Sequence, residues 1–225
     1  MANQAYASVW CRGFGEETMP PLFEKLLETV PFSKSWPGFS WLVIRAVDAM
    51  EAPLEERDLR AFPPTADELV EMARDHLHAD CAYEVQANWD LWTYDLSLGR
   101  WKQGPERLEV ICNGTEYDGG ICGEAGHFLL ELGMEHLFTG HGNLLGARSA
   151  AAAAAPQHPT EAEFLSRMAE PKRLREYHEK TRENIAALFD WMRKIETALP
   201  VERFRLWSEG EDNFEARLDE ILALR

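Results

Sequence analysis

The sequence predicts an α+β fold, in which a mainly antiparallel sheet carries helices on one face and an all-helical C-terminal segment follows. Three observations indicate this: a capped amphipathic helix from Thr65, a one-sided strand directly after it, and helical periodicity from Thr160 onward. A strand that is apolar on one face only belongs to a sheet with one face on the core and the other toward water. That arrangement is typical of antiparallel sheets.

The N-terminal part of the chain predicts a strand, a helix and a second strand. Residues 6–14 alternate loosely between apolar and polar positions, which favours a strand. A helix with an apolar stripe begins at Pro20, where proline is tolerated, and stops at Pro31. Residues 39–47 are rich in β-branched and aromatic side chains and predict the second strand. The polar, proline-bounded residues 49–64 predict an irregular connection.

The helix and strand between Thr65 and Trp92 are the best-defined elements of the sequence. Thr65 and Glu68 have the spacing of a capping box, and apolar residues then recur at helical intervals. After Asp80 the period changes to two, so that alternate side chains point to opposite faces of a strand. The residues predicted on its polar face are Glu84, Gln86, Asn88 and Asp90.

Two further strands complete the predicted sheet. A hairpin connection over residues 97–105 leads into a strand at 107–114, and a glycine-rich turn precedes a short strand at 127–133. The last of these could instead continue as a helix through Phe138. The resulting order of elements resembles that of the ferredoxin-like class of α/β sandwiches, and this resemblance of element order implies no function.

Composition divides the chain into three parts. Residues 1–146 form an acidic α+β sandwich domain, residues 147–159 an alanine-, glycine- and proline-rich linker, and residues 160–225 a helical segment. Within that segment, apolar residues at spacings of three and four form a seam over residues 174–199. The seam packs on the sheet domain or mediates self-association, so a homo-oligomer is one expectation.

Charge restricts the kinds of partner that the protein can have. The net charge is −16, and residues 1–146 contain 10 Lys and Arg against 24 Asp and Glu. An acidic field repels nucleic-acid phosphate and anionic lipid, and it steers basic protein surfaces toward it. The sequence has neither a run of ~20 apolar residues nor a signal peptide. It therefore predicts a cytoplasmic protein with four reduced cysteines, a preference for basic protein partners, and no nucleic-acid or membrane partner.

One compact group of metal-ligand residue types invites a metal-site hypothesis. His76, His78 and Cys81 carry imidazole and thiol groups, which zinc prefers. Positions i and i+2 do not share a helical face, so the three side chains converge only if the helix ends near His76. Histidines at a helix C-terminus also need no metal, because they complement the helix dipole. A second, more dispersed group consists of Cys122, His127, His136 and His141.

The polar face of the strand after Asp80 predicts a recognition surface. On it, Trp92 and the nearby Trp101 would be aromatic anchors, and the carboxylates and amides would form a charged and polar rim. The alternative is that C-terminal helices cover both tryptophans. The predicted binding residues are Glu84, Gln86, Asn88, Asp90, Trp92 and Trp101.

Two functional hypotheses follow. The first is a non-enzymatic protein-interaction module, of which an acidic inhibitor or immunity-type protein that blocks a basic enzyme is a concrete form. This form needs no cofactor. The second is a metal-dependent enzyme that uses zinc or a similar ion held by His76, His78 and Cys81.

Overall fold

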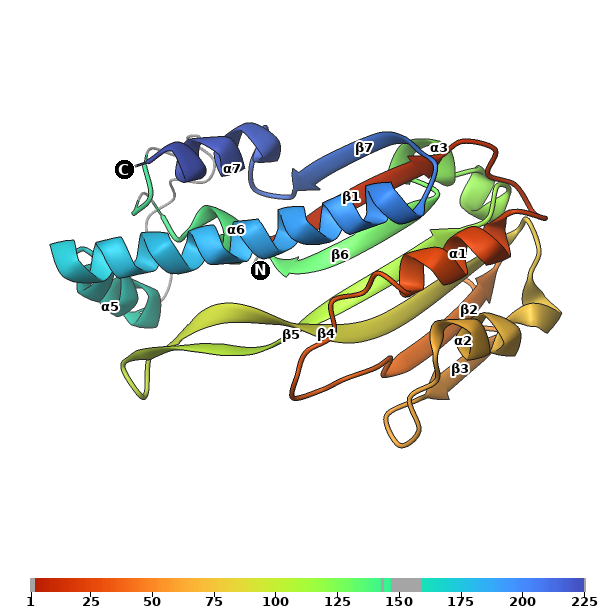
Figure 1. The fold of residues 1–225 in the computed structure, drawn as a ribbon, viewed down its shortest axis with the longest axis horizontal. Coiled ribbons are helices and arrows are strands. Elements are labelled where there is room, and N and C mark those ends of the chain that lie inside the picture. The colour runs from red at the N-terminus through yellow and green to blue at the C-terminus, as the bar shows by residue number, and fades with distance from the viewer. Residues whose placement is uncertain (1–2, 143, 147–158, 225) are drawn as a thin grey trace.

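The protein is built on one antiparallel sheet of seven strands in the order β3-β2-β4-β5-β6-β1-β7 (Figure 1). The computed structural model describes residues 3–142, 144–146 and 159–224. Helices and sheet together make an α+β protein, so the predicted fold class is confirmed at that level. The strands are β1 (Gln4–Cys11), β2 (Trp41–Ala46), β3 (Glu55–Asp58), β4 (Cys81–Asp95), β5 (Arg100–Asn113), β6 (Phe128–Met134) and β7 (Val201–Ser208).

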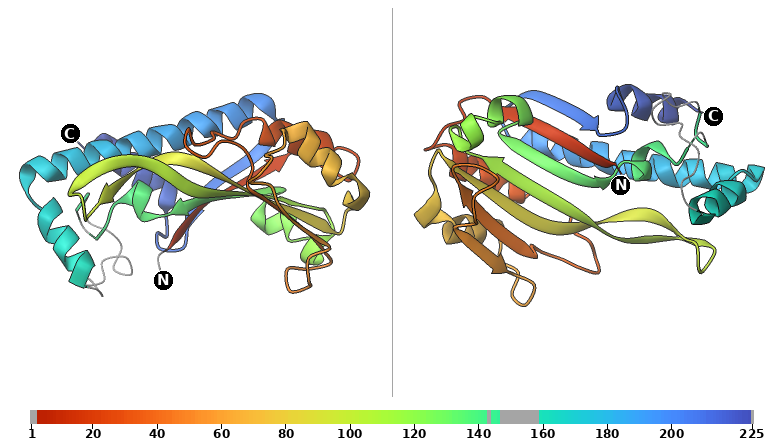
Figure 2. Two further views of the ribbon diagram at one scale, coloured as in Figure 1. Left: turned by 90° about the horizontal axis from the view of Figure 1, so that it is seen from below. Right: turned by 180° about the vertical axis from the view of Figure 1, so that it is seen from behind.

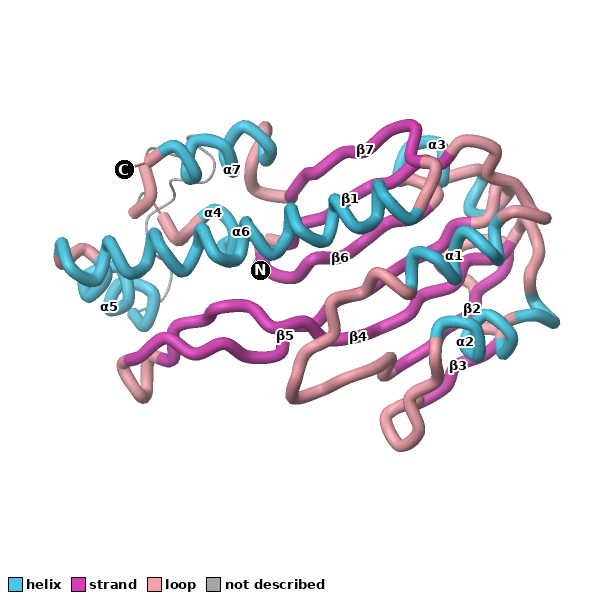
Figure 3. Tube along the Cα trace, viewed as in Figure 1, coloured by secondary structure: helices cyan, strands magenta, loops and turns pink. Residues whose placement is uncertain are grey.

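The helices differ widely in length and in place along the chain (Figure 3). The longest, α6 (Pro171–Ala198), runs across one face of the sheet, where α1 (Met19–Leu27) and α2 (Ala66–Met72) also lie (Figure 2). The others are α3 (Cys122–Ala125), α4 (His136–Thr139), α5 (Pro159–Met168) and α7 (Phe214–Ala223), with short 3-10 turns η1 (Arg74–His76) and η2 (Tyr117–Gly119). No helix among the described residues is both long enough and apolar enough to cross a membrane.

The core lies between the sheet and the layer formed by α1, α2 and α6. Alternate residues of β4 are buried against these helices, as the period of two in the sequence predicts. Trp89 of β4 contacts Trp191 of α6 with ring centroids 5.7 Å apart, and both indoles are 1% exposed. The predicted capping box is present at the start of α2, where the Thr65 N–H donates to the Glu68 carboxylate at 2.9 Å.

The C-terminal part of the chain is not all-helical. After Pro200 ends α6, residues 201–208 form β7, which pairs antiparallel with β1. The reason is a local alternation: Phe204 and Leu206 face inward between exposed arginines, a period of two that the long helical seam before it obscured. The seam at 174–199 itself is helical, and its apolar residues are buried in the core of the same chain.

Three further details differ from the sequence-based expectations. Residues 49–64 contain β3, a charged edge strand with no apolar alternation. The β4–β5 hairpin is longer than predicted, because its ladder runs on to Asp95 opposite Arg100 and leaves residues 96–99 as the turn. The ferredoxin-like element order is not confirmed, since the observed sheet inserts β3 and ends with β7. Most of the predicted linker, residues 147–158, lies outside the described part of the chain.

Candidate functional site: the uncovered face of the sheet

Among the described residues, no helix lies over the centre of the sheet face opposite α1, α2 and α6, and we call this the uncovered face (Figure 2). The end near α3 is overlaid, where the Trp10 indole N–H donates to the Cys122 carbonyl at 2.9 Å. Side chains on this face alternate along each strand with those of the core. Polar groups on seven strands therefore lie side by side on one broad surface.

Strand register aligns one residue from each strand into a line across this face. Glu109 of β5 lies opposite Glu131 of β6, and Glu131 in turn lies opposite Tyr6 of β1. Continued in both directions, the same register reaches both edges of the sheet. We call this line the central row; in order across the sheet it consists of Asp58, Trp41, Gln86, Glu109, Glu131, Tyr6 and Trp207.

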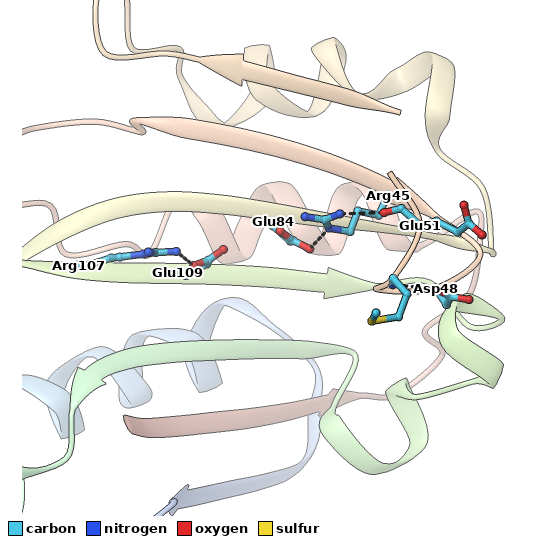
Figure 4. Close-up of polar contacts among 7 residues, drawn as sticks. Arg45, Asp48, Glu51, Glu84, Arg107 and Glu109 are labelled. Atoms are coloured by element: carbon cyan, nitrogen blue, oxygen red, sulfur yellow. Dashed lines mark hydrogen bonds and ion pairs between the residues drawn. The ribbon is translucent and has the colours of Figure 1, made fainter. Parts of the chain in front are cut away.

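The middle of the central row is acidic, because Glu109 and Glu131 lie opposite each other. Glu109 is 6% exposed and forms an ion pair with Arg107 of the same strand (Figure 4). Glu84, in the neighbouring row, pairs with Arg45 at 2.9 Å. Glu131 is half-buried, and its carboxylate has no hydrogen bond or ion pair with any residue that the structure describes. The face thus presents one carboxylate without an ion pair of its own beside two that have one, and it shares the Arg107 guanidinium of its neighbour only at longer range.

The surroundings of Glu131 disfavour its negative charge. Burial, and then the nearby Glu109 carboxylate, raise the pKa of Glu131 above its ordinary value, and the Arg107 guanidinium offsets this only in part. The pKa of Tyr6 is also raised, first by burial and then by its hydrogen bond to Glu209 at 3.0 Å. Tyr6 is therefore a neutral phenol beside a carboxylate that has no ion pair of its own. A cation placed over Glu131 would relieve the repulsion between the two glutamates.

Aromatic residues lie at or next to both ends of the central row. At the β7 end, Tyr6 stacks on Trp207 with centroids 4.2 Å apart, and the Trp207 indole N–H donates to the buried Ser8 hydroxyl at 3.0 Å. At the β3 end, the Arg60 guanidinium lies 5.9 Å from the centre of the Trp41 ring and pairs with Asp58. Large rigid side chains with a polar tip are typical anchors of protein interfaces.

An open hollow with a volume of about 420 Å³ lies beside the Trp41 end of the row. Asp90 positions the loop that forms one wall, since its carboxylate accepts from the Ser33 hydroxyl at 2.5 Å and from the Lys34 N–H at 3.0 Å. The residues lining the hollow are Trp36, Ser40, Trp41, Arg60, Gln86, Asn88 and Pro105.

The predicted binding residues divide into two groups. Alternation along β4 places Glu84, Gln86, Asn88 and Asp90 together on the uncovered face. Trp92 instead contacts α6: Lys180 Nζ lies 3.7 Å from its ring centre, and its indole N–H donates to Glu183 at 2.6 Å. Trp101 stacks on Tyr177, also in α6, at 5.5 Å. The turn end of the long β4–β5 hairpin thus packs against α6. Both indoles contact this C-terminal helix, as in the alternative given above.

His76, His78 and Cys81 have separate surroundings. His76 lies 3.8 Å from Glu55, and the more exposed His78 lies 3.7 Å from Glu16. The Cys81 thiol is buried beside Asp80, and burial raises its pKa, which disfavours the thiolate that metals bind. Within the described ranges, no group of three His, Cys, Asp or Glu side chains could hold a metal ion.

The second histidine and cysteine group is also spread over different environments. His127 stacks on Phe14, and its Nδ1 accepts from the Cys11 N–H at 3.0 Å. The Cys122 thiol lies 3.9 Å from the Thr115 carbonyl oxygen. His136 and His141 lie together, with ring centroids 4.0 Å apart. The Cys122 thiol and the His127 ring thus each contact other groups. A thiol–imidazole nucleophile requires a hydrogen bond between the two side chains, which these contacts do not provide.

The predicted binding residues include Gln86 of the central row and omit its other six members, namely Asp58, Trp41, Glu109, Glu131, Tyr6 and Trp207. The available signal was alternation within each strand, since Glu131 stands between the buried Leu130 and Leu132. Alternation gives the face of a residue but not the residue opposite it on the next strand.

Comparison of the chain with protein-family models, with curated proteins and with solved structures finds no match. The arguments about function therefore depend on the geometry of the uncovered face.

The unfavourable surroundings of the ionised Glu131 carboxylate lead to a prediction about stability. A carboxylate whose pKa is raised by folding stabilises the folded state at low pH and loses that contribution as pH rises through the folded-state pKa. Glu131→Gln is therefore expected to raise the free energy of unfolding at pH 7 by roughly 0.5 kcal/mol, allowing for solvent screening. The gain should vanish at about pH 3, where the carboxyl group is protonated in both states.

Urea denaturation of both proteins at the two pH values measures this difference. The matched control is Glu179→Gln, which removes the same charge from an exposed position of α6. A destabilised Glu131→Gln variant at pH 7 would show that the carboxylate has a stabilising partner and would contradict the prediction.

Proposed function

We propose that the protein is a non-enzymatic binding protein whose uncovered face takes a basic surface of a protein partner. The observation that carries this proposal is Glu131: a half-buried carboxylate, raised in pKa by burial and by Glu109, whose nearest cation, Arg107, is already paired with Glu109. A Lys or Arg side chain of a partner would supply the missing charge. An inhibitor that covers a basic enzyme is one form that such a protein could take.

The surroundings of Glu131 support recognition by a protein in particular. Interfaces combine aromatic anchors with a polar rim, and the central row has aromatic residues at or next to both ends and the carboxylates Glu109 and Glu131 between them. The six strand spacings of the row span about 29 Å, which is the scale of a protein interface rather than of a small ligand. The overall charge of −16 favours rapid association with a basic surface.

The same carboxylates support an enzyme less well. Glu109 and Glu131 are adjacent, and paired carboxylates can do acid–base chemistry when a cleft separates their pKa values and excludes water. Here they lie on the open face of a sheet, and the hollow beside them is lined by indoles, amides and a hydroxyl rather than by carboxylates. Binding of a partner requires neither a cleft nor a separation of the two pKa values.

Charge reversal at Glu131 tests the proposal. Partners retained from lysate on immobilised protein should be eluted by raising the salt concentration, because the attraction is electrostatic. Glu131→Lys should lower retention about tenfold or more, since it places like charges in contact at the interface. Glu179→Lys makes the same change on the exposed side of α6 and should retain the partners.

Two results would count against this function. One is retention by Glu131→Lys of the same proteins in the same amounts. The other is retention that does not fall between low and high salt, because steering by the acidic face would then be absent.

A further inference from the structure

The hollow beside the central row has apolar walls that are exposed to water, although large apolar surfaces are normally buried. Trp36 is 56% exposed and Trp41 is half-buried, and the exposed Pro105 adds a third flat apolar surface. Exposed apolar side chains gathered around a concavity mark an interaction site more often than singly scattered ones do.

Hydrogen-bond donors without partners line the same hollow. The indole N–H groups of Trp36 and Trp41, and the side-chain amides of Gln86 and Asn88, make no hydrogen bond with the described residues. The Ser40 hydroxyl already donates to the Gln86 carbonyl at 3.2 Å. These groups thus comprise six N–H donors and two amide oxygens, and the Arg60 guanidinium, which pairs with Asp58, adds further N–H groups to the wall. This excess of donors complements a ligand rich in acceptors and poor in N–H groups.

A proline-bearing segment has this chemistry. Proline lacks a backbone N–H, and the polyproline II conformation leaves every carbonyl free to accept. Aromatic-lined grooves recognise such segments because the ligand is already extended and loses little entropy on binding. Flat indole and pyrrolidine surfaces supply the apolar contact, and amide or indole N–H groups bind the carbonyls.

We propose that the hollow binds prolines of an extended segment that also places a basic residue on Glu131. This inference rests on the proposed function and specifies the partner segment. Gln86 of the hollow and Glu131 are two strands apart in the central row, a separation of about 10 Å. At 3.1 Å per residue in polyproline II, that distance corresponds to about three residues. The segment therefore has a Lys or Arg about three positions from its proline.

Synthetic peptides test this spacing on the full-length protein. The first is acetyl-Ala-Pro-Pro-Ala-Ala-Arg-Ala-amide, and three matched peptides replace both prolines by alanine, the arginine by glutamine, or move the arginine next to the prolines. Calorimetric titration should show that the first peptide binds about tenfold more tightly than each of the others. Trp36→Ala should weaken its binding about as much as loss of the prolines does.

Two protein variants complete the design. Met50→Ala removes an apolar side chain that is 94% exposed on the β2–β3 loop, away from the hollow, and should leave binding unchanged. Glu131→Gln should weaken the arginine peptide and not the glutamine peptide. Together, the variants distinguish the contribution of the hollow to peptide binding from that of the Glu131 carboxylate.

The possible failures are distinguishable. If the proline and alanine peptides bind equally while Glu131→Gln still matters, this inference is wrong and the proposed function stands. If Trp36→Ala leaves binding unchanged, or if no peptide binds, the hollow is not a proline site. The proposed function would be overturned separately, by the salt and charge-reversal experiment.

Discussion

Replacing Trp191 by alanine is expected to lower the free energy of unfolding by about 3–5 kcal/mol. The indole lies in the middle of α6, is 1% exposed, and packs against Trp89 of β4. Its N–H donates to the Thr29 hydroxyl at 3.0 Å, just beyond the end of α1. One side chain thus joins two helices and the sheet, and its loss leaves a cavity that neighbouring elements cannot fill. Urea denaturation followed by circular dichroism measures the effect.

Thr29→Val is the control for hydrogen bonding without a cavity. It keeps the indole in place and removes its acceptor, and it also removes the bond that the Thr29 hydroxyl donates to the Leu26 carbonyl at 2.7 Å, so the expected loss is about 2 kcal/mol for the two bonds. A loss below about 1.5 kcal/mol for Trp191→Ala would contradict the observed packing. It would mean that the seam at 174–199 is solvent-exposed in the monomer and is available for self-association.

Asn184→Leu is expected to cost about 3 kcal/mol or more, although it hardly changes side-chain volume. Asn184 is 2% exposed on α6, and its side chain holds the backbone of two other elements. It accepts from the Trp92 N–H at 2.8 Å and donates to the carbonyls of Trp92 and Leu137 at 3.1 and 3.0 Å. Leucine leaves these three backbone groups without the partner on which they depend.

Two measurements check this prediction. Denaturation gives the loss of stability, and amide hydrogen exchange should accelerate most at Trp92, whose N–H loses its acceptor. Thr181→Val is the matched control, because Thr181 is 3% exposed on the same helix and its hydroxyl has no hydrogen bond among the described residues. Equal stability of the Asn184 and Thr181 variants would show that the amide does not hold the β4 backbone.

How much of the candidate site could be predicted depends on which physical rule fixes each part. Strand alternation is local, so Glu84, Gln86, Asn88 and Asp90 could be assigned to one face from the sequence. The same rule failed for Trp92, because the twist of a long hairpin carries its end toward α6. Alternation says nothing about such long-range coiling.

Two strands could not be found by the same reasoning, for opposite reasons. β3 is four charged or polar residues at the sheet edge and has no apolar face to reveal it. β7 has alternation, but it follows a long seam with helical spacing that dominates the pattern of the C-terminal part. The central row could not be predicted from the sequence, because cross-strand register depends on turns and bulges. One bulge lies in β1 between Ala5 and Tyr6.

The pairing of β7 with β1 has a consequence for synthesis. The central row joins Tyr6 to Trp207, side chains that leave the ribosome about 200 residues apart. A nascent chain that has made the first six strands still lacks the Trp207 end of the row, and the free edge of β1 is open to wrong pairing meanwhile. Such distant contacts also slow folding. A partner that requires the complete row would therefore bind only finished, folded molecules and would pass over growing or truncated ones.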